Sequence, residues 1–384
     1  MVELITNVNN AINGFVWGVP MLVLLVGTGI LMTVLTKFFQ LSHIGHWFQN
    51  TVGGIFHDKH VTKHTEAGDQ SISQFQSLCT ALAATIGTGN IVGVASALVA
   101  GGPGAIFWMW VVAFFGMMTN YSENVLGIYY RRRNSKGEWS GGAMYYLKDG
   151  LGSYKGCKQI GAILATLFSA FCLLASFGIG NMSQVNSIAA NMTSAFSIPA
   201  TVTGIVLVLV GALVIVGGLK RIASVTEKLV PFMAIAYVLG ALVIFFANIS
   251  HVGAIFTAIF KGAFGLKAVG GGIVGSGVKL ALTWGMKRGV FSNEAGLGSS
   301  VMVHSSSNVK EPVRQGMWGI FEVFADTMVV CTLTAFAVLS SGLIDLDTGA
   351  VLVDVSGSAL VGQAFATVFG SFGPAFIAIA ILLF

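Results

Sequence analysis

Long runs of apolar residues recur along the whole chain. Two of them, at 201–218 and 229–249, contain no charged residue. A helix needs about 20 apolar residues to cross the hydrocarbon core of a bilayer. The strands of a membrane β-barrel would instead be segments of about 10 residues with alternating apolar and polar positions, and these runs are continuous. The pattern therefore predicts an all-α integral membrane protein.

Hydropathy and loop residues together predict nine membrane spans. They lie near 17–37, 70–100, 103–130, 160–182, 199–218, 229–249, 270–290, 315–340 and from 358 onward. Two segments between spans, 41–56 and 255–264, have the short amphipathic pattern of helices that lie in the headgroup plane. The final apolar run continues to Phe384, so we expect the chain to be truncated within its ninth span.

The charged residues predict how the chain crosses the membrane. Only 9% of the 384 residues are charged and 55% are hydrophobic, whereas a soluble domain has about 25% charged residues. If the N-terminus is outside, 16 of the 20 lysines and arginines fall in four loops at 38–69, 131–159, 219–228 and 287–314, and Lys37 at the edge of the first loop makes 17 on this side. Because basic loops stay in the cytoplasm, we predict a plasma-membrane protein with this orientation and no nucleic-acid partner.

No pattern typical of an enzyme is present. The four cysteines are far apart, and the chain has neither a Gly-x-Ser-x-Gly elbow nor a His-Glu-x-x-His zinc motif. The histidines at 57, 60 and 64 lie in a polar loop with no apolar frame, which disfavours a metal site there. We predict a protein that is not an enzyme and has no cofactor.

Glycine and small polar residues interrupt the span predicted at 70–100. Gly87 and Gly89 flank Thr88 near its middle, and Asn90 follows. Glycine lets the backbone leave the helical conformation, and transporters often bind substrate where a spanning helix breaks. A half-helix that begins after Gly89 would attract a carboxylate to its N–H groups, and carbonyls before the break could bind a cation. Alternatively, the small residues only allow close helix packing.

A second interruption is predicted in the span at 270–290, five spans after the first. This span carries glycines at 270, 271, 272, 275 and 277, followed by Thr283, Trp284 and Gly285. We expect it to run in the same direction as 70–100 and to begin the second half of a five-helix inverted repeat. Residues 1–384 would form one transporter domain: an extra helix at 17–37, a first repeat at about 70–249 and an incomplete second repeat from about 270.

Two carboxylates share one face of the predicted 315–340 helix. Glu322 and Asp326 are four residues apart, and Thr327 follows. A carboxylate inside the membrane is costly unless it is paired with a cation, a proton or a hydrogen-bond donor. Asp326, near the middle of the membrane, is therefore a candidate for binding a coupling ion, and Glu322 is a weaker one. Alternatively, Lys279 pairs with Asp326 in a purely structural role.

Three motifs resemble those of one transporter family. GGPGAIFWMW at 101–110, SLCTALAATIGTGN at 77–90 and FSNEAG at 291–296 are similar to segments of the alanine/glycine:cation symporters. The resemblance implies a LeuT-type 5+5 inverted-repeat fold of the amino acid–polyamine–cation superfamily. It also implies uptake of alanine and glycine driven by sodium or a proton.

The resemblance also implies which residues contact the transported species. The substrate carboxylate would meet N–H groups around Gly87, Thr88 and Gly89, with the Asn90 side chain nearby. A sodium ion would bind the carbonyls of Ala83 and Ile86.

The rest of the predicted pocket comes from other segments. The substrate ammonium would face carbonyls near Thr85 and in a broken stretch at Thr283, Trp284 and Gly285. Trp284, Phe168 and Phe171 would supply the walls that limit the side chain to the size of alanine. Two alternatives from other functional classes remain open, a cation channel and an amino acid receptor that does not transport.

Overall fold

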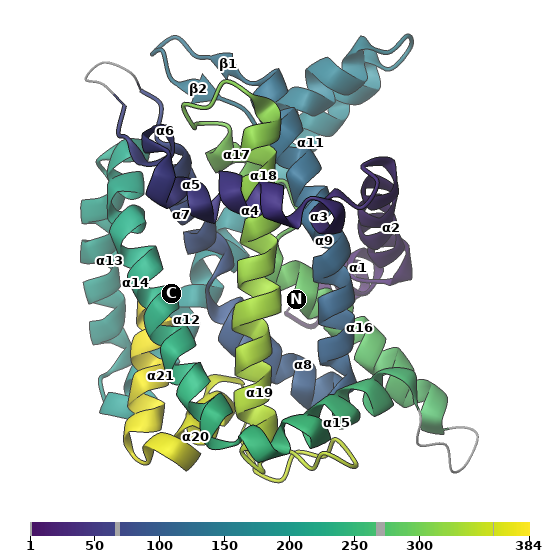
Figure 1. The fold of residues 1–384 in the computed structure, drawn as a ribbon, viewed down its shortest axis with the longest axis vertical. Helices are drawn as coiled ribbons and strands as arrows, with labels where there is room; N and C mark the ends of the chain where they lie inside the picture. Colours follow the sequence, from purple (N-terminus) through teal and green to yellow (C-terminus); the bar gives the residue numbers. More distant parts are fainter. Residues whose placement is uncertain (1, 66–69, 266–272, 356) are drawn as a thin grey trace.

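The computed structural model describes residues 2–65, 70–265, 273–355 and 357–384. The described chain is almost entirely helical, as predicted, and its long helices run between two ends of the molecule (Figure 1). Its N-terminal part forms α1 (Val2–Val16), α2 (Val19–Leu35), α3 (Phe39–Ser42), α4 (Ile44–Asn50), α5 (Val52–His57), α6 (Lys59–Thr62), α7 (Gln74–Thr85), η1 (Gly89–Gly93), α8 (Val94–Gly101) and α9 (Gly104–Tyr130).

The middle and C-terminal parts add the only two strands of the described chain, which pair antiparallel. The middle part forms β1 (Arg132–Arg133), β2 (Trp139–Ser140), α10 (Ala143–Tyr145), η2 (Tyr146–Gly150), η3 (Leu151–Ser153), α11 (Lys158–Phe177), η4 (Gly178–Met182), α12 (Ser183–Phe196), α13 (Ala200–Ile215) and α14 (Gly218–Ala247). The C-terminal part forms η5 (Ile249–His251), α15 (Val252–Phe264), α16 (Ile273–Asn293), α17 (Ser300–His304), α18 (Pro312–Val323), η6 (Phe324–Cys331), α19 (Thr332–Ser340), α20 (Gly357–Phe369) and α21 (Phe372–Leu383).

Most predicted spans coincide with helices. Five helices of the described chain are long and apolar enough to cross a membrane, and a sixth span results if α7 and the bent helix that follows it count as one. The helix that begins at Lys158 continues to Phe196, well past the predicted end at 182. The predicted single span from 358 is wrong, because the chain turns at Gly370, with a φ of +58°, and α21 packs back against α20.

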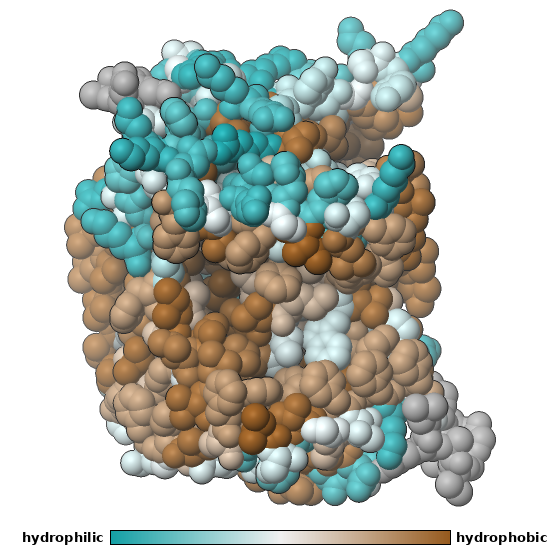
Figure 2. All heavy atoms as spheres, viewed as in Figure 1, coloured by the Kyte–Doolittle hydropathy of each residue, from teal (hydrophilic) through white to brown (hydrophobic). Residues whose placement is uncertain are grey.

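On the face shown in Figure 2, an apolar belt lies between two polar ends. Exposed valine, leucine and isoleucine side chains on α2, α11, α13 and α14 belong to this belt. Burying such a surface in lipid removes it from water, so the belt supports a multi-pass membrane protein. The end that carries Lys59, Arg131, Arg132, Arg133 and Lys310 is called the basic end below (Figures 1 and 2).

Short helices lie across both ends. At the basic end, α3 and α4 run across the bundle (Figure 1). The indole of Trp47 on α4 is buried and donates to the Gln40 carbonyl. At the opposite end, α15 crosses below α9 and α19. These helices coincide with the two amphipathic segments predicted at 41–56 and 255–264.

The long helix α9 is the central element, and small residues bring its neighbours close. A Cβ atom at Gly319 of α18 would lie 2.9 Å from the Asn120 carbonyl oxygen of α9, and one at Gly285 of α16 would lie 2.7 Å from Trp108 Cβ. Only glycine allows helices to approach this closely. The glycines at 285 and 319 therefore fix α16 and α18 against α9.

Candidate functional site

The span predicted at 70–100 is broken in its middle. α7 ends at Thr85, and the helix that resumes as η1 and α8 is bent by 46° from it. Residues 86 and 87 form no hydrogen-bonded turn, and the Gly87 amide donates to Asn90 Oδ1 at 2.8 Å. The carbonyls of Ala83 and Ile86 are therefore left out of the helical hydrogen-bond ladder.

At the start of the second half-helix, some backbone amides donate to protein groups of the described chain and others do not. Gly87 donates to the Asn90 side chain, and the Asn90 amide donates to the Gly87 carbonyl at 3.1 Å. Within the described chain, the amides of Thr88 and Gly89 donate to no protein group. Unpaired amides at a helix N-terminus attract anions; of these two residues, Gly89 lines the adjacent cavity and Thr88 does not.

A second helix breaks opposite the first, but not where the sequence predicted. Thr283, Trp284 and Gly285 lie inside the regular helix α16, so the predicted broken stretch there is wrong. The break follows at 294–299, before α17, and begins with Glu294 at a φ of +54°. The glycines at 270–272 lie outside the described residues.

The direction of the second broken span also differs from the prediction. The first runs from the basic end toward the opposite end, and α16 runs back toward the basic end (Figure 1). Five spans separate the starts of the two broken spans, and an odd number of crossings reverses the direction of the chain. η1 and α8 pack against α16 as an antiparallel pair.

A cavity of about 310 Å³ lies between the two breaks. Such a volume is at the lower end for small-molecule sites. The residues that line it are Ala83, Ala84, Thr85, Gly87, Gly89, Ile179, Gly180, Gln184, Phe291, Glu294 and Phe384. Four predicted site residues, Ala83, Thr85, Gly87 and Gly89, are therefore brought together around one cavity.

The sequence did not single out Gln184, Phe291 or Glu294 as site residues. A Cβ atom at Gly87 would lie 3.5 Å from Gln184 Nε2, so this amide faces the broken backbone. The Glu294 carboxylate accepts a hydrogen bond from the Ser299 hydroxyl. Two features of the sequence could have indicated these residues. One is the polar residue at 184 in a long apolar helix, and the other is the FSNEAG motif at 291–296.

The predicted aromatic walls lie elsewhere. Phe171 is 64% exposed on the apolar belt, and Phe168 packs against the second break, where a Cβ atom at Gly298 would lie 2.8 Å from its ring. Trp284 stacks with Arg288, whose guanidinium lies 5.5 Å from the indole centroid. The chain reaches the cavity further along, through η4 and α12, because the helix from Lys158 continues past the predicted end of the span.

Asp326 lies in the protein interior beside the first break. Its carboxylate is fully buried and accepts hydrogen bonds from Asn90 Nδ2 at 2.6 Å, Ser292 Oγ at 2.9 Å and Thr327 Oγ1 at 2.7 Å. Lys279 is exposed and takes no part in these bonds, so the predicted pair of Lys279 with Asp326 is wrong. The Asn90 side chain is committed to Gly87 and Asp326, which differs from its predicted place beside the substrate.

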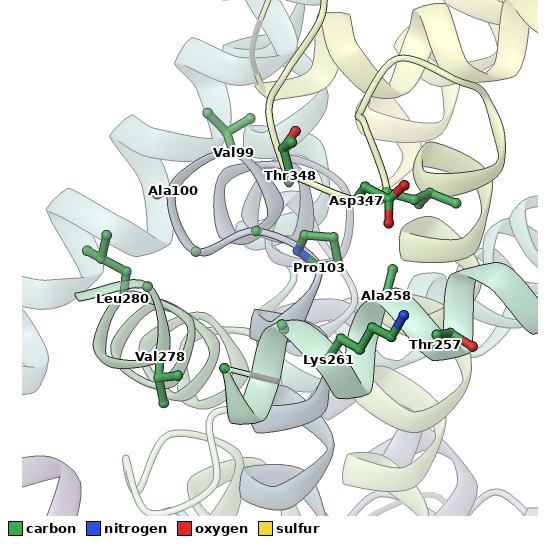
Figure 3. Close-up of a pocket in the computed structure, with 18 of the residues that line it drawn as sticks. Val99, Ala100, Pro103, Thr257, Ala258, Lys261, Val278, Leu280, Asp347 and Thr348 are labelled. Atoms are coloured by element: carbon green, nitrogen blue, oxygen red, sulfur yellow. The ribbon is translucent and has the colours of Figure 1, made fainter. Parts of the chain in front are cut away.

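A larger cavity of about 720 Å³ lies at the opposite end, near the turn between α8 and α9. Figure 3 shows Lys261 of α15 and Asp347 of the loop after α19 along the same side of it. None of the predicted site residues lines this cavity. Within the described chain, no group of three or more histidine, cysteine or acidic side chains could hold a metal ion.

The apolar belt and the two opposed helix breaks around a small pocket define a multi-pass membrane transporter. A family model for the sodium:alanine symporter family matches residues 2–384. The chain belongs to this family, which confirms the resemblance found in the sequence. It is therefore a cation-coupled amino acid transporter and not an enzyme.

Curated relatives share this assignment over most of their length. The chain is 45% identical over 356 residues to the sodium/alanine symporter AgcS of Methanococcus maripaludis, which covers 93% of this chain and 74% of the relative. It is 38% identical over 381 residues to the putative sodium/proton-dependent alanine carrier protein YrbD of Bacillus subtilis, covering 97% and 74%. It is 34% identical over 385 residues to the probable sodium/glutamine symporter GlnT of the same organism, covering 100% and 74%.

Proposed function

We propose that this protein is a symporter that couples the inward movement of sodium to the uptake of alanine and glycine across the plasma membrane. The observation that carries the proposal is the cavity between two opposed helix breaks, with free amides on one side and a carboxylate on the other. A zwitterionic amino acid has the complementary charges. The names of the relatives, which mention sodium with alanine or with glutamine, support the class of substrate.

The substrate carboxylate would bind the N–H groups of Thr88 and Gly89, at the positive end of the second half-helix. Gln184 would donate a further hydrogen bond from the facing helix. The substrate ammonium would face the Glu294 carboxylate and the Thr85 carbonyl, both at the cavity wall. In this arrangement the carboxylate and the ammonium of one substrate molecule bind at separate places, and neither group contacts a lysine or an arginine.

The coupling cation would use the oxygen atoms that the first break releases. The carbonyls of Ala83 and Ile86 accept no hydrogen bond from the next helical turn, and carbonyl oxygens are suitable ligands for sodium. Asp326 would balance the charge of a cation close to the break, because Asn90 links its carboxylate to the Gly87 backbone. A proton on Asp326 is the alternative coupling ion.

The two breaks also support the LeuT-type 5+5 inverted repeat. In this arrangement α7 and α16 begin the two repeats, and they run in opposite directions as an inverted repeat requires (Figure 1). α2 would be the extra helix outside the repeat. Under the positive-inside rule the basic end would face the cytoplasm, with the N-terminus outside.

Uptake into liposomes tests the proposed function. Labelled alanine should accumulate inside when a sodium gradient is imposed, and excess glycine should reduce the accumulation. Excess glutamine tests whether a larger side chain also fits. Accumulation with a proton gradient alone would replace sodium by a proton as the coupling ion. Binding without accumulation under any gradient would support a receptor, and an alanine-independent sodium current would support a channel.

Substitution of Gly87 by valine should narrow the cavity. The added Cβ atom would point toward Gln184 at an ordinary contact distance of 3.5 Å, and the nearest groups are side chains, so the helix break should survive. We expect alanine affinity to fall at least tenfold, measured by equilibrium binding to purified protein. The matched control is Gly178→Val, where a Cβ atom would meet nothing within 4 Å. Equal affinities in the two variants would place the substrate elsewhere.

Substitution of Glu294 by glutamine tests the ammonium contact. Loss of the negative charge should weaken binding of alanine about tenfold or more, because a charged hydrogen bond contributes about 1.5–3 kcal/mol. The test compares alanine with N-acetylalanine as competitor, because the nitrogen of N-acetylalanine is an uncharged amide. The variant should discriminate less between the two ligands than the wild type does. Unchanged discrimination would remove Glu294 from the ammonium site.

Substitution of Asp326 by asparagine tests the coupling ion. The variant keeps the size of the side chain and loses its charge, so alanine uptake should become several-fold less dependent on sodium concentration. The selectivity among alanine, glycine and glutamine should not change, because Asp326 does not line the cavity. A sodium dependence identical to that of the wild type would leave Asp326 with only a structural role.

A further inference from the structure

A second buried carboxylate forms a separate centre, closer to the basic end. Glu322 and His304 are both fully buried, and His304 Nε2 lies 3.1 Å from Glu322 Oε2. Asn120 Nδ2 donates to the same oxygen at 2.9 Å. Neither residue lines the cavity between the breaks, and neither bonds to Asp326.

The partners of His304 define where its proton lies. Its Nδ1 atom is 2.6 Å from Gln315 Nε2, and Gln315 Oε1 accepts from the Ser307 hydroxyl at 3.1 Å. With Gln315 Nε2 as the donor, Nδ1 carries no hydrogen. The single imidazole proton is then on Nε2 and is donated to Glu322. The histidine is neutral in this arrangement, so the pair has one net negative charge.

The negative charge of this pair lies in the protein interior, and among the described residues one oxygen of the Glu322 carboxylate has no hydrogen-bond partner. Within the described chain, Glu322 Oε1 has no hydrogen-bond partner although it is fully buried. A buried ionised carboxylate with one oxygen left without a hydrogen bond is costly. A proton on Oε1 would neutralise the pair without moving any neighbour. A metal cation is disfavoured, because the groups that contact Glu322 Oε2 are N–H donors, which do not bind metal ions.

No neighbouring charge neutralises the pair. Among the described residues, the ion pairs of the structure include none between Glu322 and a lysine or arginine. Arg131 is directed instead to the carbonyls of Ser305, Ser307 and Val309. The titratable and charged residues on the elements packed against α17 and α18 are His46 on α4, Cys79 on α7, Tyr121, Glu123, Tyr129 and Tyr130 on α9, and Asp326 and Cys331 on η6. Three further ones lie just outside these elements: Arg131 after α9, Glu294 before α17, and Asp58, which pairs with Arg314 of α18.

We propose that Glu322 and His304 form a proton-binding site, with Glu322 Oε1 as the atom that takes up the proton from water at the basic end. Glu322 becomes a neutral carboxylic acid, and His304 keeps its proton on Nε2. The site is distinct from Asp326 and from the substrate cavity. It lies where α17, α18 and α7 meet, because Ser77 of α7 also contacts His304 Nδ1, at 3.3 Å. Protonation of Glu322 removes the negative charge at the place where α18 contacts α17 and α7.

Infrared difference spectroscopy of the purified full chain in detergent tests this site without substrate or transport. Lowering the pH should produce the C=O band of a protonated buried carboxylic acid, and subtraction of the Glu322→Gln spectrum should isolate one such band. Asp149→Asn is the control, because Asp149 is paired with the exposed Arg132 at the surface. This variant should keep the band.

The His304→Gln variant adds an independent measurement that retains the carboxyl group. Without the imidazole donor, Oε2 of the protonated Glu322 accepts one hydrogen bond fewer, so its C=O band should move to higher wavenumber. Gel filtration confirms that each variant is folded. The proposal is overturned if the wild type and Glu322→Gln show the same bands at every pH. An unmoved band in His304→Gln would exclude His304 from the site. Both outcomes are independent of whether alanine is transported.

Discussion

The side-chain amide of Asn90 bonds both to the broken backbone of the first helix and to the buried carboxylate of Asp326. Its Oδ1 accepts from Gly87 at 2.8 Å, and its Nδ2 donates to Asp326 at 2.6 Å. A break in a membrane helix exposes polar backbone groups that lipid cannot satisfy. Asn90 satisfies one of them, while in the described chain the amides of Thr88 and Gly89 and the carbonyls of Ala83 and Ile86 stay outside the helical hydrogen-bond ladder. The same residue therefore stabilises the break and connects it to the acidic centre.

Close packing of small residues keeps this arrangement in place. A Cβ atom at Gly89 would lie 3.2 Å from Ser292 Cα, so the first break rests directly on α16, one residue before Asn293 ends that helix. Ser292 in turn donates to Asp326. The two glycines of the first break thus have different surroundings. Gly89 allows close helix packing, whereas Gly87 faces Gln184 across the cavity.

The hydrophobic pattern was sufficient to predict the helices, because lipid exposure requires long apolar runs whatever the tertiary contacts. It was also sufficient for the first break, where two glycines and an asparagine coincide in one span. It misplaced the second break, because Gly285 serves helix packing against α9, whereas the real break begins at Glu294 and contains Gly296 and Gly298, both with positive φ. The partners of Asp326 and Glu322 depend on contacts between residues far apart in the chain, which local pattern does not contain.

The buried carboxylates share a property that fits ion coupling. Glu123 accepts from the Gly296 amide, Asp326 from Asn90, Ser292 and Thr327, and Glu322 from Asn120 and His304. In the described chain, each of them is held by amides, hydroxyls or an imidazole rather than by lysine or arginine. A fixed basic partner would neutralise the carboxylate permanently. Neutral donors hold its position and leave its charge to be balanced by an ion that can leave, which a transporter needs at each turn of its cycle.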